Sequence, residues 1–335
     1  MPKPKTTYVQ IFDKKEGEIK FVSLTSVESL NNMIHNGFSA DIVNTFEMTQ
    51  DAHIGHIASN IERHGGVQVI MIAGPSSSGK TTFSKRLALH LLMRGFKPYP
   101  ISLDDYFVNR EDTPIDENGE KDFEHINAVN VKRFNEDMRT LINGGEVELP
   151  KYDFKTGLNK PSGRHLKLQE GMILIVEGIH GLNPILTESL PQQNIFRIYV
   201  SSLIRYYFTD NESDGYVPRT DQRLIRRIIR DCKYRGISAS QSIARWPSVR
   251  RGEERWIFPF QQYADEEFCS TLLYELSILK NQALSALVEV RPGDTSYEKA
   301  GELIDYLIRF NTIEEHFVPP TSLLREFLGG SSFHY

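Results

Sequence analysis

The chain has 335 residues, 39% hydrophobic side chains and a formal net charge of −5. This length and apolar content suffice for a large core, in two domains or in one domain with appendages, and the negative charge argues against a general affinity for nucleic acids. The two cysteines, Cys232 and Cys269, are too few for a disulfide framework and are not at C-x-x-C spacing, so we expect a reducing compartment.

The first residues lack the apolar centre of a signal peptide, and no run approaches the roughly 20 apolar residues of a membrane span. We therefore expect a soluble, cytoplasmic protein. The chain divides at Gly65-Gly66, and Ile54, Ile57 and Ile61 predict one short amphipathic helix just before that point. The expected parts are an N-terminal extension (residues 1–65), a core (66–300), and a C-terminal helix with a tail docked on the core or on a partner subunit (301–335).

Residues Gly74–Thr81 read GPSSSGKT and fit the pattern G-x-x-x-x-G-K-[ST] at every required position. The apolar run Val67–Ala73 before them predicts a buried strand, and leucines at helical spacing after them predict a helix that ends near Gly95. In this context the pattern indicates a phosphate-binding loop, in which Lys80 reaches the β and γ phosphates and Thr81 holds Mg²⁺. The predicted nucleotide-binding residues are Gly74, Pro75, Ser76, Ser77, Ser78, Gly79, Lys80, Thr81 and Thr82.

Beyond this loop, apolar strands alternate with helices. We expect strands over residues 97–103, 172–176 and 195–200, helices over 131–142 and 219–235, a loop over 109–119, and a hairpin whose strands, 147–152 and 165–168, flank a turn at 157–163. The alternation predicts an α/β fold of the P-loop NTPase type: a parallel sheet flanked by helices, with a small β-hairpin and a helical lid. Ligands of such sheets bind at the carboxyl ends of the strands.

Three acidic residues, Asp104, Asp105 and Glu177, follow predicted strands at that edge. Phosphoryl transfer needs a group that orients the attacking hydroxyl or accepts its proton, and Asp104 is our candidate. Asp105 is its rival, but adjacent strand residues point to opposite faces, so only one of the two can face the phosphates. Glu177 suits a magnesium ligand, directly or through water. The alternative for each acid is a solvated loop carboxylate or a helix cap.

Positive charge is concentrated in residues 219–255, which contain eleven Lys/Arg and four acidic residues. Arginines recur there at i, i+3, i+4 and i+7 with no acid among them, at positions Arg223, Arg226, Arg227 and Arg230. Arginine rather than lysine favours bidentate contact with phosphate, so we interpret this face as a polyanion clamp, with a solvated helix face as the alternative. For the aromatic residues that follow, Trp246 and Trp256 among them, core packing is favoured over stacking on bases.

The motifs GPSSSGKTT, SLDDYF, FEHINA, LPKYDF, VEGIH and RRIIRD occur in this order between about Val67 and Asp265. Together they resemble the uridine kinase and phosphoribulokinase family of P-loop kinases, and their joint order is far more specific than the loop alone. The resemblance implies that Asp104 is the catalytic acid and Glu177 the magnesium-associated glutamate. It further implies lid arginines that approach the phosphates at Arg227 and Arg230, and substrate-binding residues at Glu124, Tyr152 and Phe154.

Two positions that would read the base depart from the uridine kinase pattern, and a third departs at the ribose. Gly157 stands where a histidine normally meets the pyrimidine, and Arg245 aligns where a glutamine is expected to help read the base. Glu124 replaces the usual aspartate that holds the ribose hydroxyls. The chain looks most like a divergent nucleoside kinase branch, which in some bacteria follows domains resembling the N-terminal region of threonyl-tRNA synthetase.

The sequence thus predicts an ATP- and Mg²⁺-dependent kinase that phosphorylates the 5′-hydroxyl of a ribonucleoside, with uridine or cytidine favoured. Its catalytic groups would be Lys80, Asp104, Arg227 and Arg230. A phosphoribulokinase-like sugar-phosphate kinase is one alternative, in which Arg245 meets a substrate phosphate. A non-catalytic ATP-sensing regulatory protein is another, and RNA binding through the Trp/Arg block is a third. The expected partner is a small molecule rather than nucleic acid or membrane, and a homo-oligomer stays open.

Overall fold

The computed structural model describes residues 7–13, 18–117 and 119–334, which form two compact units. The first unit combines the chain up to Ala52 with Ser202–Trp246 and the chain from Cys269 onward. The second unit combines His53–Ser201 with Pro247–Phe268. The expected division at Gly65-Gly66 stays a prediction.

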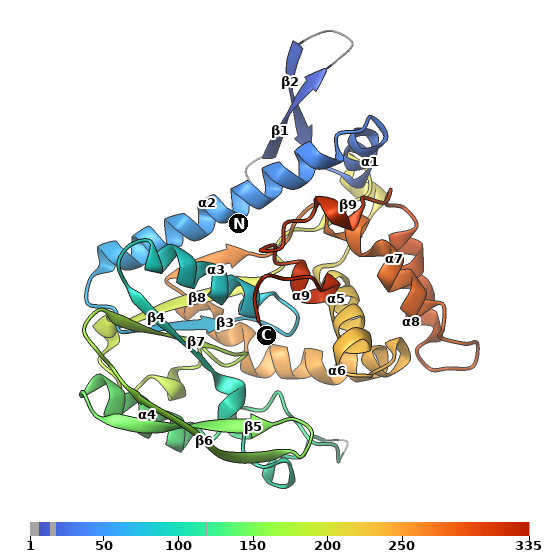
Figure 1. Ribbon diagram of the computed structural model, residues 1–335. Coiled ribbons are helices and arrows are strands. Elements are labelled where there is room, and N and C mark those ends of the chain that lie inside the picture. Colours follow the sequence, from blue (N-terminus) through green and yellow to red (C-terminus); the bar gives the residue numbers. More distant parts are fainter. Residues whose placement is uncertain (1–6, 14–17, 118, 335) are drawn as a thin grey trace. The chain divides into compact units, whose positions relative to one another are not determined.

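A five-stranded sheet with the order β11-β8-β3-β7-β4 forms the centre of the second unit (Figure 1). Its strands are β3 (Val69–Ala73), β4 (Lys97–Ser102), β7 (Met172–Glu177), β8 (Ile195–Ser201) and β11 (Glu266–Cys269). The central strand β3 is parallel to both of its neighbours and is buried along its whole length. An all-apolar strand is expected there, because a parallel sheet is covered on both faces. The predicted α/β class is confirmed, and so are the four predicted strands that correspond to β3, β4, β7 and β8, whereas β11 was not predicted.

The register brings the carboxyl ends of three strands to the same edge of the sheet. Ile72 of β3 is paired with Glu177 of β7, and Glu177 is paired with Ser102 of β4. The loop after β3 leads directly into helix α3 (Lys80–Leu92), which runs along one side of the sheet (Figure 1). The candidate acids and the phosphate-binding loop therefore meet at one edge, as the topology of a parallel sheet requires.

The hairpin beside helix α4 (Val131–Ile142) consists of β5 (Glu146–Asp153) and β6 (Leu158–Lys167). The predicted turn at 157–163 is wrong, because β6 already begins at Leu158. Gly163, at the end of the predicted turn, instead lies at an irregularity within the strand pair, where the register shifts between Leu149 and Pro150. Such a bulge absorbs extra residues within a strand, and glycine tolerates its backbone geometry.

The first unit is mostly helical. Its described elements are the antiparallel strands β1 (Thr7–Asp13) and β2 (Glu18–Leu24), the two-residue strands β9 (Tyr206–Tyr207) and β10 (Tyr216–Val217), and the helices α1 (Val27–His35), α5 (Arg219–Tyr234), α7 (Glu275–Leu287), α8 (Tyr297–Leu307) and α9 (Arg325–Leu328). Two long helices pass from one unit into the other: α2 (Ser39–His64) and α6 (Ala239–Trp256).

Two expectations at the chain ends are refined by the structure. The helix predicted before the core is not short, because α2 has 26 residues and begins at Ser39. The apolar tail packs within the first unit, where Leu324 and Phe327 are wholly buried and the Leu328 carbonyl accepts a hydrogen bond from Lys233. The tail is rich in apolar residues because they are buried against other parts of the same chain.

Candidate functional site

The loop between β3 and α3 has the backbone of a phosphate cradle. A Cβ at Gly74 would lie 1.9 Å from the Val200 carbonyl oxygen, so no other residue fits where the loop leaves the sheet. Gly79, just before α3, has φ +85°, in the left-handed region that favours glycine. The two glycines bend the loop around the start of a helix whose first N–H groups lack partners within the helix.

The side chains of this loop fit a nucleotide with its magnesium ion. The Thr81 hydroxyl lies 3.4 Å from the Glu177 carboxylate, which joins the two predicted magnesium ligands. The Lys80 ammonium is nearly buried and donates to the Pro75 carbonyl at 3.2 Å, so it folds back over the loop. The Ser78 hydroxyl is buried without a hydrogen-bond partner among the described residues. An orphaned hydroxyl in a cradle of this shape fits a bound anion.

The two adjacent aspartates are separated by their partners. Both belong to a 3₁₀ turn, Leu103–Tyr106, that follows β4, so the expectation that they alternate along a strand is wrong. Asp105 is directed to the hairpin, where its carboxylate pairs with Lys151 at 3.1 Å and with Arg164 at 3.4 Å. Asp104 is the second residue of the same turn, and its backbone N–H donates a hydrogen bond to the Ser102 hydroxyl. The neutralised Asp105 leaves Asp104 as the candidate for the reacting hydroxyl.

The predicted substrate-binding residues on the hairpin are also in the second unit. Tyr152 is 3% exposed, and its ring packs edge-on against Phe107 and Phe154 with centroids 5.5 and 5.0 Å away. Its hydroxyl is buried without a partner among the described residues. The Phe154 ring is 60% exposed, which is unusual for so large an apolar side chain. An exposed ring beside a buried hydroxyl is the surface that a planar ligand could cover.

Glu124 is held by the end of helix α6. A Cβ at Gly252 would lie 2.3 Å from the Glu124 Cβ, so glycine is required for the helix to approach this closely. The neighbouring Arg251 pairs with Glu117 at 3.2 Å. Trp256, near the same helix end, places its ring 4.4 Å from the His125 ring and packs against the apolar core of the second unit. The preference for core packing of this tryptophan agrees with the structure.

His180, three residues after Glu177, is a buried group that the sequence did not single out. It is 1% exposed, and burial lowers its pKa to about 3, although backbone groups of Trp256 and His125 act in the opposite direction. The charges of His125 and Lys80 add to the lowering of the pKa. The imidazole is therefore neutral near pH 7 and lies within electrostatic range of the loop lysine. Only its place in the motif VEGIH could have drawn attention to it.

The arginine face predicted on α5 is largely internal to the first unit. Arg226 is fully buried and pairs with Glu275, with 3.0 Å between Nε and Oε1. Arg223 is also buried, with its guanidinium 5.2 Å from the ring centre of Trp246. These two cannot form an exposed clamp, so the four-arginine interpretation is wrong, because acids and rings distant in sequence cover half of it.

The two arginines named for the lid lie close to a carboxylate. Arg227 and Arg230 pair with Asp231 at 3.3 and 2.9 Å, and Arg235 pairs with it at 3.4 Å. Arg245 is exposed on α6. These residues belong to the first unit, whereas the phosphate-binding loop belongs to the second, and the roles of Arg227, Arg230 and Arg245 towards a ligand stay predictions.

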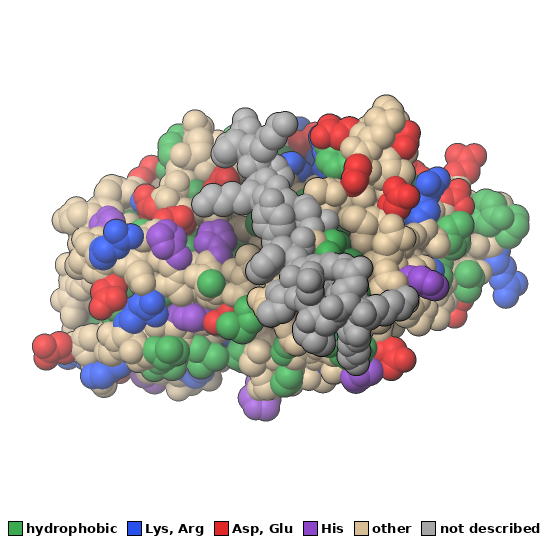
Figure 2. Space-filling model, turned by 90° about the horizontal axis from the view of Figure 1, so that it is seen from above, with side chains coloured by type: hydrophobic (Ala, Val, Ile, Leu, Met, Phe, Trp, Pro, Cys, Tyr) green, Lys and Arg blue, Asp and Glu red, His purple; other side chains and the backbone are tan. Residues whose placement is uncertain are grey.

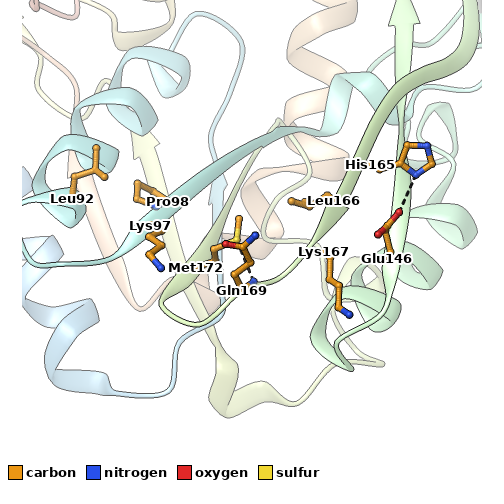
Figure 3. Close-up of a pocket in the computed structure, with 9 residues that line it drawn as sticks. All are labelled: Leu92, Lys97, Pro98, Glu146, His165, Leu166, Lys167, Gln169 and Met172. Carbon is orange, nitrogen blue, oxygen red and sulfur yellow. Dashed lines mark hydrogen bonds and ion pairs between the residues drawn. The ribbon is translucent and has the colours of Figure 1, made fainter.

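A separate hollow of about 490 Å³ opens between the sheet and the hairpin (Figure 3). It is lined by Lys97 and Met172, the first residues of β4 and β7, so it lies at the end of the sheet opposite to the phosphate-binding loop. His165 and Glu146 pair beside it at 3.3 Å. It belongs to no part of the predicted site.

The charged side chains on one face of the molecule are mixed in sign. Figure 2 shows a face on which acidic, basic and histidine side chains are interspersed rather than gathered into a basic field. Within the ranges that the structure describes, no helix has the length and apolar character needed to cross a membrane.

Known proteins are similar to the part of the chain that contains the phosphate-binding loop and the candidate acids. Residues 69–271, more than half of the chain, match the family described as "Phosphoribulokinase / Uridine kinase family". The chain is 31% identical over 199 residues to the uridine kinases of Staphylococcus aureus strains JH9 and Newman, which covers 59% of this chain and 84% of each relative. It also resembles a solved structure described as a "Possible Uridine Kinase" from Bacillus stearothermophilus, at 21% identity and a TM-score of 0.44 over 66% of this chain and 99% of that one.

Proposed function

Because the chain belongs to the phosphoribulokinase and uridine kinase family of P-loop kinases, we propose that it transfers the γ-phosphate of ATP to the 5′-hydroxyl of a ribonucleoside, uridine or cytidine foremost. Family membership by itself makes the chain a phosphotransferase and implies the use of ATP. The acceptor and the residues that perform the transfer belong to the proposal.

The contact between Thr81 and Glu177 carries this proposal. A P-loop threonine and an acid at the end of a neighbouring strand lie 3.4 Å apart, which is close enough for both to reach one small cation. Thr81 and Glu177 would hold Mg²⁺ when it is bound, and the ion would supply positive charge that offsets the charge developing during transfer. A site that only buried a Ser/Gly loop would have no reason to bring this hydroxyl and this carboxylate together.

We assign the following binding and catalytic roles to residues of the chain. Lys80 and the loop N–H groups hold the β and γ phosphates, and Lys80 neutralises charge on the transferred group. Asp104 orients the acceptor hydroxyl and takes its proton. Arg227 and Arg230 close over the phosphates, for which they would have to exchange their pairing with Asp231. Glu124, Tyr152 and Phe154 hold the acceptor.

A sugar-phosphate acceptor is the second candidate. The glycine at 157 removes a side chain that would meet a base, and Arg245 supplies a charge that suits phosphate. A regulatory protein that binds ATP without transferring phosphate is the third, and it predicts no acceptor-dependent release of ADP.

The test is a screen of ADP release with uridine, cytidine, deoxynucleosides and pentose phosphates as acceptors. Stimulation by a ribonucleoside supports the proposal, stimulation by a pentose phosphate alone supports the second candidate, and no stimulation supports the third. Lys80→Ala is the control. It should lower kcat by at least on the order of 10²-fold without unfolding the protein, because the charge it removes acts on the transferred group. A folded Lys80→Ala protein with full activity would contradict the mechanism.

A further inference from the structure

The hairpin turn leaves no room for a side chain at residue 157. Gly157 has φ +73°, and a Cβ built there would lie 2.7, 2.8 and 2.9 Å from Cβ, Nε and Cζ of Arg110. The Arg110 side chain therefore lies across the glycine, in the space that any larger residue would use. The Arg110 backbone N–H donates a hydrogen bond to the Gly157 carbonyl at 2.8 Å, so both the main chain and the side chain of Arg110 contact this turn.

The segment that carries Arg110 is fixed to the hairpin along its length. The Asn159 side-chain amide donates to the carbonyls of Asp105 and Phe107 at 2.8 and 2.9 Å. The Asn159 backbone N–H donates to the Asn109 side chain at 2.9 Å. These bonds begin one residue after Asp104 and end one residue before Arg110. The candidate catalytic acid and Arg110 thus lie on one short segment whose path the hairpin determines.

The guanidinium of Arg110 keeps donors available. One of its N–H groups donates to the Phe154 carbonyl at 2.5 Å, and within the described residues the side chain has no other hydrogen bond or ion pair. Arginine has five N–H donors and no acceptor, and the Arg110 side chain is exposed. It stands beside Phe154, whose exposed ring lies next to the Tyr152 ring. A fork of free donors against an aromatic surface is suited to a planar or anionic group that bears oxygen.

We propose that Arg110 is the acceptor-specificity residue of this enzyme: it takes the space vacated at Gly157 and donates hydrogen bonds to an acceptor oxygen, a base carbonyl or a phosphate. This inference rests on the proposed kinase function. The same hairpin has a hollow of about 710 Å³ lined by Lys151, Lys155, Lys160 and Arg164. Asp153 lines it with them, and Asp105 pairs with Lys151 and Arg164, so part of this positive charge is neutralised and the remainder can meet either a base carbonyl or a phosphate.

The experiment compares Arg110→Ala, Arg110→Lys and the control Arg139→Ala with the unmodified protein. Arg139 is an exposed arginine of helix α4, so its removal costs the same charge at a different place. For each protein, kcat/KM is measured with uridine, cytidine and a pentose phosphate, together with the KM for ATP and the thermal melting temperature. We expect Arg110→Ala to lower kcat/KM for the best acceptor by about 10- to 100-fold, mainly through KM, at unchanged KM for ATP and unchanged melting temperature.

The acceptor whose kcat/KM falls most in Arg110→Ala shows whether Arg110 binds a base carbonyl or a phosphate. A loss confined to the pentose phosphate assigns Arg110 to a phosphate, and Arg110→Lys then retains part of the activity because lysine keeps the charge. A loss confined to uridine and cytidine assigns it to a base carbonyl. Gly157→Ala should shift the acceptor preference in the same direction, because its Cβ displaces the arginine, and it should shift nothing further in the Arg110→Ala background.

Unchanged kcat/KM for every acceptor in a folded Arg110→Ala protein would overturn the inference and leave Arg110 a structural part of the turn. Failure of the proposed function is a different result: the unmodified protein would then release no ADP in response to any acceptor, and the inference would fall with it.

Discussion

In the loop Gly74–Thr81 the groups that can face a phosphate are backbone amides and one lysine, whereas in helix α5 they are arginine side chains. The loop amides are placed by two glycines and the start of α3, all within a few residues. On α5, Arg226 forms a buried ion pair with Glu275, which lies 49 positions further along the chain. Local geometry prepares the loop for a ligand, but the availability of each α5 arginine depends on which distant acid the fold brings to it.

The site around this loop is tested most strongly by replacing each of the two adjacent aspartates, Asp104 and Asp105, in turn. Asp104→Asn keeps the size of the side chain but removes its charge and its capacity to accept a proton. We expect kcat to fall by about 10²- to 10⁴-fold with little change in the KM for ATP. Asp105→Asn should be milder, because Asp105 pairs with Lys151 and Arg164 on the hairpin. If Asp105→Asn proves the more damaging change, the assignment is wrong by one residue.

In the second region the largest effect should be on stability. Arg226→Met leaves the Glu275 carboxylate buried without its charge partner, which should lower the free energy of unfolding by about 3–5 kcal/mol. The double variant Arg226→Met/Glu275→Leu removes both charges and should recover most of that loss. Chemical denaturation of the three proteins measures both changes. A single variant as stable as the unmodified chain would mean that Arg226 is not committed to this pair.

The sequence predicted elements whose signals are local. Helix α4 has the predicted bounds, because Asn130 caps its first turn and Gly144 follows its end with a positive φ. The hairpin turn was misplaced because Gly163 and Pro161, which signal turns, here serve an irregular strand. The core of the site, Lys80, Thr81 and Glu177, was predicted because a motif and a strand end suffice to place it. Three features could not be predicted: the burial of Arg226, the environment of His180 and the contact of Arg110 with Gly157. Each depends on contacts between segments far apart in sequence, which the periodicity of a single segment does not indicate.

A fall in pH should lower the stability of the folded protein through His180, which follows β7. Its pKa is about 3 in the folded protein and near 6.5 in the unfolded chain, so between these values the unfolded state binds the additional proton. Stability from this group is complete above about pH 6.5 and is lost as the pH falls, by up to about 1.4 kcal/mol for each pH unit. Denaturation at several pH values measures the slope, and His180→Gln should reduce it. An equal slope in that variant would assign the acid sensitivity to other groups.

The smallest effect is expected at Arg245, on helix α6. Its side chain is exposed on α6, and the described residues give it no ion pair. If Arg110 supplies the donors that read the acceptor, Arg245→Gln should change kcat/KM for uridine and for a pentose phosphate by only a few fold. A charge-assisted hydrogen bond to phosphate is about twice as strong as a neutral one, so loss of a true phosphate contact would instead raise the KM of the phosphorylated acceptor markedly. A rise of about tenfold or more for that acceptor alone, with uridine unaffected, would move phosphate recognition from the hairpin to α6. Tight, strictly uridine-specific kinetics in the unmodified protein would contradict both assignments, because neither arginine provides the paired donor and acceptor that distinguish one neutral base from another.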